Sequence, residues 1–404
     1  METEKLYWVD PFATTFRATA HATALGDTPT LVLDRTLFYP ESGGQLPDAG
    51  VLAIEGQERE LRVTDVQIDD SGVIHHFVDG GLGLDPGSAI AMRGAIDVGR
   101  RRDHMAQHTA QHALSRALVD VARTETVSSR LGATSCTIDV EGALDERGVA
   151  RAEDLVNAIV RDDVVVRQLF PTPEELPNLP LRRAPKVDRG VRVIDIEGVD
   201  MSPCGGTHCT RTGQIGVVRI VGLERHKGGW RVTFHAGRRA LDDARRKEAV
   251  LGELAREFTC GVLDVGQAVG KLRVDLKERT AALSAMRDEL GELLAERILA
   301  AHPPAAGIRR IVVLRPRDDL GMLRALAGRL TSRPDVVAFC AAPDDRNAGD
   351  WSIVVQRGSH AGFDCGAWLK AAAAESGGRG GGRPERAEGR LPANASIEAL
   401  AQGS

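Results

Sequence analysis

The sequence predicts an α+β protein built from four successive parts: a small β-barrel in residues 1–95, an α+β domain in 96–240, a helical segment in 241–303 and an α/β globule in 304–404. Three observations support this order. Short alternating apolar runs separated by turn residues fill the first part. Helical periodicity is strong in the second and third parts, and apolar runs alternate with helical segments in the last.

The first part is expected to form a barrel because its strands are short and are separated by Gly, Asp and Pro. The predicted strands cover residues 30–34, 60–66, 73–78 and 89–92. The loop at residues 41–45 contains two adjacent glycines. They permit a close approach of the backbone to a ligand or a neighbouring domain, and equally a plain hairpin turn.

The second part opens with a helix that carries three histidines on one face. His104, His108 and His112 follow one another at intervals of four residues in a segment without Gly or Pro, and residues four apart are neighbours on a helix. The rest of this part is expected to form a helix at 145–162, strands at 135–140, 164–169 and 191–196, and a long hairpin from strands at 213–221 and 229–235.

A loop in the second part adds a cysteine and a further histidine. In Cys204-Gly-Gly-Thr-His208, the two glycines let the thiol and the imidazole turn inward together. With two of the helix histidines, this pair makes a tetrahedral zinc set; a solvated histidine pair is the alternative for the helix alone. A zincin-type protease is disfavoured, because Thr109 follows His108 where that class has a glutamate base.

Three segments together resemble a known family. They are Thr-Leu-Phe-Tyr-Pro-Glu-Ser-Gly-Gly-Gln at 36–45, His108-Thr-Ala-Gln-His112 and Cys204-Gly-Gly-Thr-His208. Their sequence, order and separation resemble the editing domain of alanyl-tRNA synthetase and the free-standing AlaX-type trans-editing proteins. The resemblance implies that His108, His112, Cys204 and His208 bind Zn²⁺, and that the second part is the editing (aminoacyl-tRNA deacylase) domain.

The same resemblance suggests roles for residues outside the metal set. Gln45 is expected to orient substrate or water, and Thr126 is expected to recognise a substrate hydroxyl in preference to two neighbouring serines. His104 lies outside the matching motif and is expected either to support the ligands or to face RNA. Cys209 is expected to be a small buried thiol rather than a competing ligand.

The implied activity is a zinc-dependent trans-editing hydrolysis that removes serine, and glycine as a further candidate, from mischarged tRNA(Ala). A site that pairs with the serine hydroxyl can spare alanine, which leaves that site unpaired. Two roles for the zinc are open. It is catalytic if it acts on water or the ester, and it is structural if all four protein ligands bind it, because no coordination position is then open. The alternatives are a non-catalytic, zinc-stabilised tRNA-binding or dimerisation module and a phosphoesterase-like nuclease, which is less well supported because the sequence lacks a carboxylate-rich metal cluster.

The third part has the periodicity of a coiled coil. One heptad position is occupied by Leu272, Arg279, Met286 and Leu293, and another by Leu276, Leu283 and Leu290. This seam predicts a helical hairpin or a homodimer. A single helix packed on its own chain is the alternative.

The last part ends in a glycine-rich stretch, residues 377–384, which lacks the Walker spacing and is as easily a flexible loop as a phosphate-binding one. This part resembles the C-terminal globular domain that alanyl-tRNA synthetase shares with DHH-type phosphoesterases, and it offers a second route to a homodimer. The resemblance covers nearly the whole chain without a class II aminoacylation domain, which is the architecture of the long AlaX form.

Composition limits the possible partners. The formal net charge of -5 and the aromatic content of 4% argue against a whole-protein electrostatic or base-stacking binder of nucleic acid, so tRNA contacts must come from local patches. Six cysteines without paired spacing indicate a reducing compartment. The N-terminus does not resemble a secretory leader, and no apolar run approaches the roughly 18 residues of a membrane span. We therefore expect a cytoplasmic protein.

Overall fold

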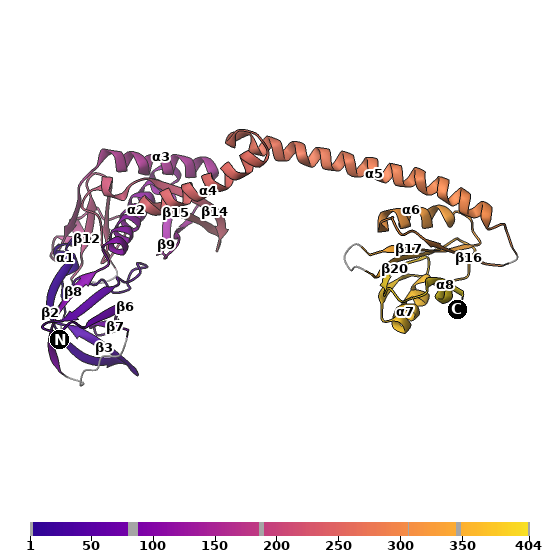
Figure 1. The fold of residues 1–404 in the computed structure, drawn as a ribbon. Helices are drawn as coiled ribbons and strands as arrows, with labels where there is room; N and C mark the ends of the chain where they lie inside the picture. Colours follow the sequence, from indigo (N-terminus) through magenta and orange to yellow (C-terminus); the bar gives the residue numbers. More distant parts are fainter. Residues whose placement is uncertain (1–2, 80–87, 186–189, 306, 345–348, 403–404) are drawn as a thin grey trace. The chain divides into compact units, whose positions relative to one another are not determined.

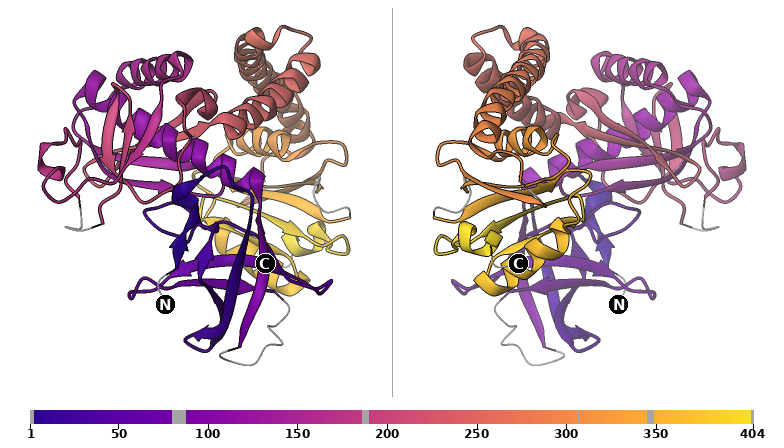
Figure 2. Two further views of the ribbon diagram at one scale, coloured as in Figure 1. Left: turned by 90° about the vertical axis from the view of Figure 1, so that its left-hand side faces the viewer. Right: turned by 90° about the vertical axis from the view of Figure 1, so that its right-hand side faces the viewer.

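The computed structural model describes residues 3–79, 88–185, 190–305, 307–344 and 349–402. The chain divides into two compact units, Met1–Gly252 and Glu253–Ser404, and each has its own helices and sheets (Figures 1 and 2). The predicted mixed α+β class is therefore confirmed. No helix within the described residues is long and apolar enough to cross a membrane.

An antiparallel barrel occupies the start of the first unit, with described strands in the closed order β2-β3-β7-β6-β5-β8. They are β2 (Thr15–Leu25), β3 (Thr28–Leu33), β5 (Gly50–Ile54), β6 (Glu60–Ile68), β7 (Ile74–Val78) and β8 (Ala89–Ile96). The short helix α1 (Leu6–Val9) precedes the barrel, and β1 (Glu4–Lys5) pairs with β4 (Arg35–Thr36). The sequence analysis missed β2 and β5. In β2 most positions hold Ala or Thr, which gives a weak apolar alternation.

Helix α2 (Val98–Ala122) carries the three histidines. Asp97 caps its first turn by accepting a hydrogen bond from the backbone N–H of Arg100 at 3.0 Å. Arg123 ends it in the left-handed conformation, with φ of 53°. All residues from 104 to 115 are buried, and apolar side chains of this stretch enter the main core of the unit. The histidines therefore face the protein interior.

Two antiparallel sheets complete the first unit. One has the order β14-β15-β10-β9 and the other β11-β12-β13. The elements of this region are β9 (Glu125–Leu131), β10 (Cys136–Glu141), α3 (Glu146–Asp162), β11 (Val166–Leu169), η1 (Leu176–Asn178), β12 (Val193–Ile196), β13 (Asp200–Pro203), η2 (Thr212–Ile215), β14 (Val218–His226), β15 (Gly229–Ala236) and α4 (Gly237–Glu257). Helix α3 packs against α2. The hairpin of β12 and β13 ends at Pro203, directly before the cysteine of the predicted metal loop.

The second unit is a five-stranded sheet with helices on both faces (Figure 1). In the order β16-β17-β18-β20-β19, β16 and β17 are parallel and the other pairs are antiparallel. Its elements are η3 (Val262–Asp264), α5 (Val265–Ala301), β16 (Arg309–Leu314), α6 (Leu320–Leu330), β17 (Val336–Pro343), β18 (Trp351–Arg357), α7 (Cys365–Ser376), β19 (Arg379–Arg383), β20 (Arg386–Leu391) and α8 (Ile397–Gln402). Alternate residues of β17 point into two separate cores. One core contains α6 and the end of α5, and the other contains α7 and α8.

The glycine-rich stretch is not simply a loop, which corrects the expectation for residues 377–384. Residues Arg379–Arg383 form the edge strand β19, paired with β20. A Cβ on Gly380 would lie 2.8 Å from the Leu369 side chain, and one on Gly382 would lie 2.3 Å from the carbonyl oxygen of Arg386. The glycines here allow α7 and β20 to pack closely on this strand.

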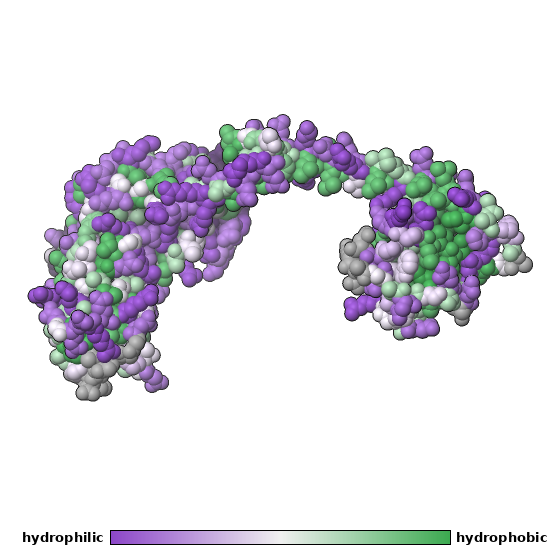
Figure 3. Space-filling model, in the orientation of Figure 1, coloured by the Kyte–Doolittle hydropathy of each residue, from purple (hydrophilic) through white to green (hydrophobic). Residues whose placement is uncertain are grey.

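Helix α5 packs on its own chain at one end and exposes its heptad seam. Gly291 and Ala295 are buried against α6. The seam residues have exposed fractions of 53% (Leu272), 64% (Leu276), 47% (Leu283), 66% (Met286), 45% (Leu290) and 60% (Leu293). Apolar side chains are visible on the surface of this helix (Figure 3). The coiled coil stays a prediction.

Candidate metal centre

Four side chains from α2 and from the loop after β13 converge in the first unit. One ligand atom each of His108, His112, Cys204 and His208 lies within 4.8 Å of those of the others. The Cys204 sulfur is 3.3 Å from Nε2 of both His108 and His208. Zinc bonds of about 2.0–2.1 Å to nitrogen and about 2.3 Å to sulfur place tetrahedral ligands roughly 3.5 Å apart. This donor set therefore fits zinc.

Hydrogen bonds at Nδ1 hold the two histidines of the cluster that lie on α2. Nδ1 of His108 lies 2.7 Å from Oε1 of Gln45, and Nδ1 of His112 lies 3.3 Å from a carboxylate oxygen of Asp200. Asp200 also accepts a hydrogen bond of 2.5 Å from Nε of Arg182. An imidazole that donates from Nδ1 has Nε2 available as a metal ligand.

Thr109 holds the third histidine in the same way. Its hydroxyl donates to the carbonyl oxygen of Met105 at 2.8 Å. It therefore accepts from Nδ1 of His208 at 3.3 Å and from the backbone N–H of Cys209 at 3.0 Å. The residue that argued against a protease is thus a support of the metal loop.

Burial and charge together favour a thiolate at the centre. Burial raises the pKa of Cys204, but His108 and His208 lower it well below its usual value. Burial lowers the pKa of His112, and Asp200 and Cys204 outweigh this effect and raise it to about 9. The thiolate is the form of cysteine that binds metals.

Gly206 gives His108 the space that it occupies. A Cβ at this position would lie 2.1 Å from Cε1 of His108 and 2.9 Å from Oε1 of Gln45. A Cβ on the neighbouring Gly205 would have no atom within 4 Å. The second glycine of the loop is therefore required for packing, and the first is not.

The chain is similar to alanine–tRNA ligases. It is 32% identical to that of Halorubrum lacusprofundi over 403 residues, which is 97% of this chain and 42% of the ligase. It is 31% identical to that of Thermobifida fusca over 390 residues, which is 90% of this chain and 42% of the ligase. The chain thus spans about two fifths of the length of these relatives. The C-Ala domain of Aquifex aeolicus alanyl-tRNA synthetase matches with 18% identity and a TM-score of 0.22, covering 24% of this chain and 90% of that domain.

Three family descriptions match parts of the chain. Residues 12–97 match "tRNA synthetases class II (A)", and residues 310–402 match "DHHA1 domain". Residues 191–233, which include Cys204 and His208, match "Threonyl and Alanyl tRNA synthetase second additional domain". The chain is an AlaX-like relative of the editing and C-terminal domains of alanyl-tRNA synthetase.

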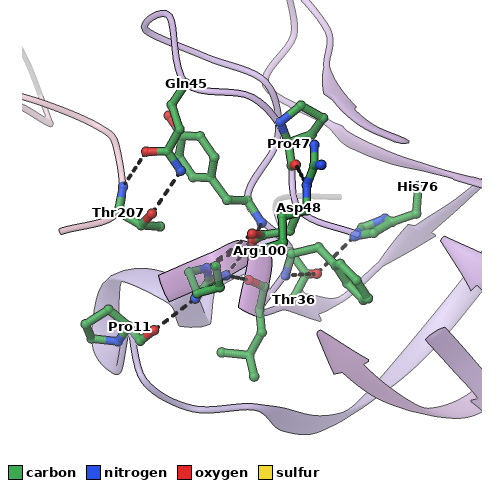
Figure 4. A network of polar contacts seen from close by, with 12 residues as sticks. Pro11, Thr36, Gln45, Pro47, Asp48, His76, Arg100 and Thr207 are labelled. Atoms are coloured by element: carbon green, nitrogen blue, oxygen red, sulfur yellow. Dashed lines mark hydrogen bonds and ion pairs between the residues drawn. The ribbon is translucent and has the colours of Figure 1, made fainter. Parts of the chain in front are cut away.

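In this AlaX-like chain, Gln45 lies beside the metal cluster, and both its amide oxygen and its amide nitrogen contact protein groups. Oε1, which contacts His108, also accepts the backbone N–H of Thr207 at 3.1 Å, and Nε2 donates to the Thr207 hydroxyl at 2.9 Å (Figure 4). The loop that carries Gln45 is anchored by the buried pair of Asp48 and Arg101 at 2.5 Å. Gln45 thus joins the barrel to both halves of the metal centre.

Thr126 lies on β9 and is linked to the centre through two arginines. Its backbone carbonyl accepts a hydrogen bond from Arg183, and the adjacent Arg182 pairs with Asp200, which holds His112. The Thr126 hydroxyl is buried and has no hydrogen-bond partner among the described residues. It is therefore a buried polar group that its described surroundings leave unpaired.

His104 and Cys209 lie near the ligands in sequence but outside the cluster. His104 is only 4% exposed, so the expectation that it faces RNA is wrong; burial lowers its pKa to about 4. Cys209 is buried as expected, and burial raises its pKa to about 11. It therefore stays a neutral thiol at neutral pH.

The sequence analysis missed the groups that hold the ligands in place. Asp200 stands four positions before Cys204, and a search for a carboxylate near each expected ligand would have found it. Arg192 and Trp8, which contact the metal loop, give no such signal. Trp8 lies on α1, before the barrel, and is 197 positions away in the sequence from Gly205, whose carbonyl it contacts.

Proposed function

We propose that this chain is a zinc-dependent hydrolase that removes serine, and glycine as a second substrate, from mischarged tRNA(Ala). The observation that carries the proposal is the cluster of one cysteine and three histidines, two of whose members lie within the match to the threonyl- and alanyl-tRNA synthetase domain. The relatives are alanine–tRNA ligases. A synthetic site for alanine excludes serine imperfectly, because one added hydroxyl gives only about hundredfold discrimination in comparable pockets.

The residues around the cluster would divide the work between metal binding and recognition. Zinc supplies Lewis-acid polarisation of an ester carbonyl when a coordination position is open to substrate. Gln45 would orient His108 and the metal loop, and Asp200 would orient His112. The unpaired hydroxyl of Thr126 would pair with the serine hydroxyl. Alanine lacks that partner and would be spared.

A second candidate is a non-catalytic tRNA-binding or dimerisation module with a structural zinc. The specific observation in its favour is that four protein donors complete a tetrahedron, which is typical of structural zinc. The engaged amide of Gln45 points the same way. The exposed seam of α5 supports a homodimer in either case.

The deciding experiment compares hydrolysis of Ser-tRNA(Ala), Gly-tRNA(Ala) and Ala-tRNA(Ala), with and without prior treatment with a chelator. We expect loss of the serine ester and, as the second substrate, of the glycine ester, while the alanine ester is spared. The chelator and either His108→Ala or Cys204→Ala should abolish this hydrolysis. Bound tRNA with all esters intact would instead support the binding module.

Recognition by Thr126 is tested by Thr126→Val, which removes the hydroxyl and keeps the shape. We expect kcat/KM for the serine ester to fall about tenfold to a hundredfold, with metal content unchanged. The control is Ser128→Ala on the same strand, because that hydroxyl donates to Asp139 at 2.7 Å near the surface. Equal effects of the two substitutions would remove Thr126 from the proposed mechanism.

A further inference from the structure

Three successive carbonyl groups of the metal loop are each held by a side chain from elsewhere in the fold. Nη1 of Arg192 donates to the carbonyl oxygens of Cys204 and Gly206, at 2.9 and 2.8 Å. The indole Nε1 of Trp8 donates to the carbonyl oxygen between them, that of Gly205, at 2.9 Å. The backbone that carries the cysteine ligand is therefore fixed at every residue.

These donors are themselves connected. Nε of Arg192 donates to Oε1 of Gln168 at 3.0 Å, and Nε2 of Gln168 donates to the backbone carbonyl of Trp8. Arg192, Gln168 and Trp8 together form a closed chain of contacts with the loop, which we call the loop clamp. Arg192 directly precedes β12, Gln168 lies on β11 and Trp8 lies on α1.

The members of the loop clamp are held firmly. Arg192 is 6% exposed. The ring of Trp8 has Nζ of Lys5 at 4.4 Å and Cζ of Arg192 at 5.6 Å from its centre, with the Phe170 ring at 6.2 Å. Cation–aromatic contacts of this kind fix both the ring and the charge. The indole N–H is therefore aimed at the loop by its own surroundings.

We propose that Trp8, Gln168 and Arg192 are positioning residues that set the place of the Cys204 sulfur, and that the N-terminal segment thereby contributes directly to metal affinity. A loop with two adjacent glycines has many accessible conformations. Metal–ligand distances tolerate deviations of only about 0.2 Å, so an unclamped loop binds metal less well. This inference rests on the metal site in the proposed function, but it does not depend on hydrolysis.

The first test is Trp8→Phe, which keeps an aromatic ring and removes the donor to Gly205. We expect the affinity for Zn²⁺, measured by competition with a chromophoric chelator, to fall about tenfold, since loss of a contact that orients a ligand typically costs 10–100-fold. The control is Trp230→Phe, because Nε1 of Trp230 is buried and has no hydrogen-bond partner among the described residues. Its affinity should equal that of the wild type.

The second test is Arg192→Lys, which keeps the charge but cannot reach the carbonyls of Cys204 and Gly206 and the amide of Gln168 together. We expect a loss of roughly 30-fold in Zn²⁺ affinity and a changed visible absorption spectrum of the Co²⁺-substituted protein. The control, Arg167→Lys, alters an exposed arginine that pairs with Glu197 on the same sheet. Circular dichroism and the thermal melt identify any variant that fails to fold, and Trp8→Phe then decides alone.

The outcomes separate this inference from the proposed function. Wild-type affinity and an unchanged Co²⁺ spectrum in both folded variants would overturn the loop clamp, whatever the hydrolytic activity. Weaker metal binding in the variants of a wild type that hydrolyses no ester would uphold the loop clamp and reject the hydrolase. A positioning role also requires Arg192→Lys to lower kcat at saturating Zn²⁺ more than it raises KM, if the wild type is active.

Discussion

Gly206 shows how sharply a single residue constrains this centre. Its position directly against the His108 ring leaves no space for a side chain, whereas the adjacent Gly205 faces open space. We predict that Gly206→Ala displaces His108 or the loop and weakens Zn²⁺ binding about a hundredfold, comparable to the loss of an orienting contact. Chelator competition measures this affinity.

Gly205→Ala is the matched control, because the added methyl group meets no atom within 4 Å. It should bind zinc like the wild type. If both alanine variants bound zinc normally, the close approach of Gly206 to His108 would have no functional importance.

His76 provides a pH-dependent contribution to the stability of the barrel. Its Nδ1–H donates to the carbonyl of Leu31 at 3.0 Å, and burial, partly opposed by this bond, lowers its pKa to about 3. Below a pH of 6.5 the unfolded chain binds a proton that the folded chain cannot, so stability falls as the pH drops from 6.5 towards 3. The loss is about 2 kcal/mol at pH 5.

The free energy of unfolding is measured with urea at pH 7 and at pH 5. Hydrogen exchange of the barrel amides at the same two pH values then shows whether the change lies in the barrel. In His76→Gln, the difference in the free energy of unfolding between pH 7 and pH 5 should be about 2 kcal/mol smaller than in the wild type. An equal pH dependence in both proteins would mean that His76 titrates normally.

At the residue scale, the sequence predicted the four residues that the structure brings into one cluster, but not the residues around them. Three histidines and one cysteine at these spacings are typical of a metal site. The structure brings the ligand atoms of His108, His112, Cys204 and His208 into one cluster. The supporting groups are ordinary arginine, aspartate, threonine and tryptophan side chains. Only the folded chain shows which of many such residues lies next to a ligand.

At the scale of elements, α5 combines a packed end with an exposed heptad seam. We predict that Leu276→Lys combined with Leu283→Lys prevents self-association, because both side chains lie on the seam and are 64% and 47% exposed. Sedimentation velocity should show monomers where the wild type forms dimers. The melting temperature of the monomer should not change, since neither side chain is buried in it.

The control for these substitutions is Ala281→Lys, on the face of α5 away from the seam. It adds the same charge and should leave self-association intact. A wild-type protein that stays monomeric at high concentration would show that the seam has no second copy as partner.

Elements built from small residues were the hardest to predict. The Ala- and Thr-rich β2 has weak hydrophobic alternation, and β19 consists of three glycines between two arginines. Glycine disfavours strands in general. At Gly380 and Gly382 of β19, α7 and the neighbouring strand β20 come so close that a side chain would clash, whereas a Cβ on Gly381 would meet no atom within 4 Å. Such packing depends on tertiary contacts that local sequence does not encode.

At the scale of the whole molecule, the four metal donors all belong to the unit Met1–Gly252. We predict that removal of zinc lowers the thermal stability of this unit and leaves the unit Glu253–Ser404 unchanged. Binding at a thousand times Kd stabilises the unit that binds by about 4 kcal/mol. Differential scanning calorimetry with and without a chelator should therefore show one transition that moves and one that does not.

Movement of both transitions in that experiment would show that the units unfold together or that the second unit also binds metal.

Composition changes suggested boundaries near residues 240 and 303, whereas the contacts divide the chain within α4. A continuous helix gives no compositional mark at such a point. The mixed α+β class and the four side chains that cluster were predictable from the sequence, and the extent of each compact unit was not.

His108 and Cys204 are 96 positions apart in the sequence, and this separation determines when the centre can form during synthesis. While the ribosome is still adding the residues between them, the histidine pair of α2 has neither its cysteine nor its third histidine. Bringing the ends of such a segment together costs on the order of 4 kcal/mol of chain entropy, which the intervening sheets and α3 must supply. We therefore predict that the proposed zinc binds late, to a domain that has already folded, so that its cellular supply affects the finished protein rather than the nascent chain.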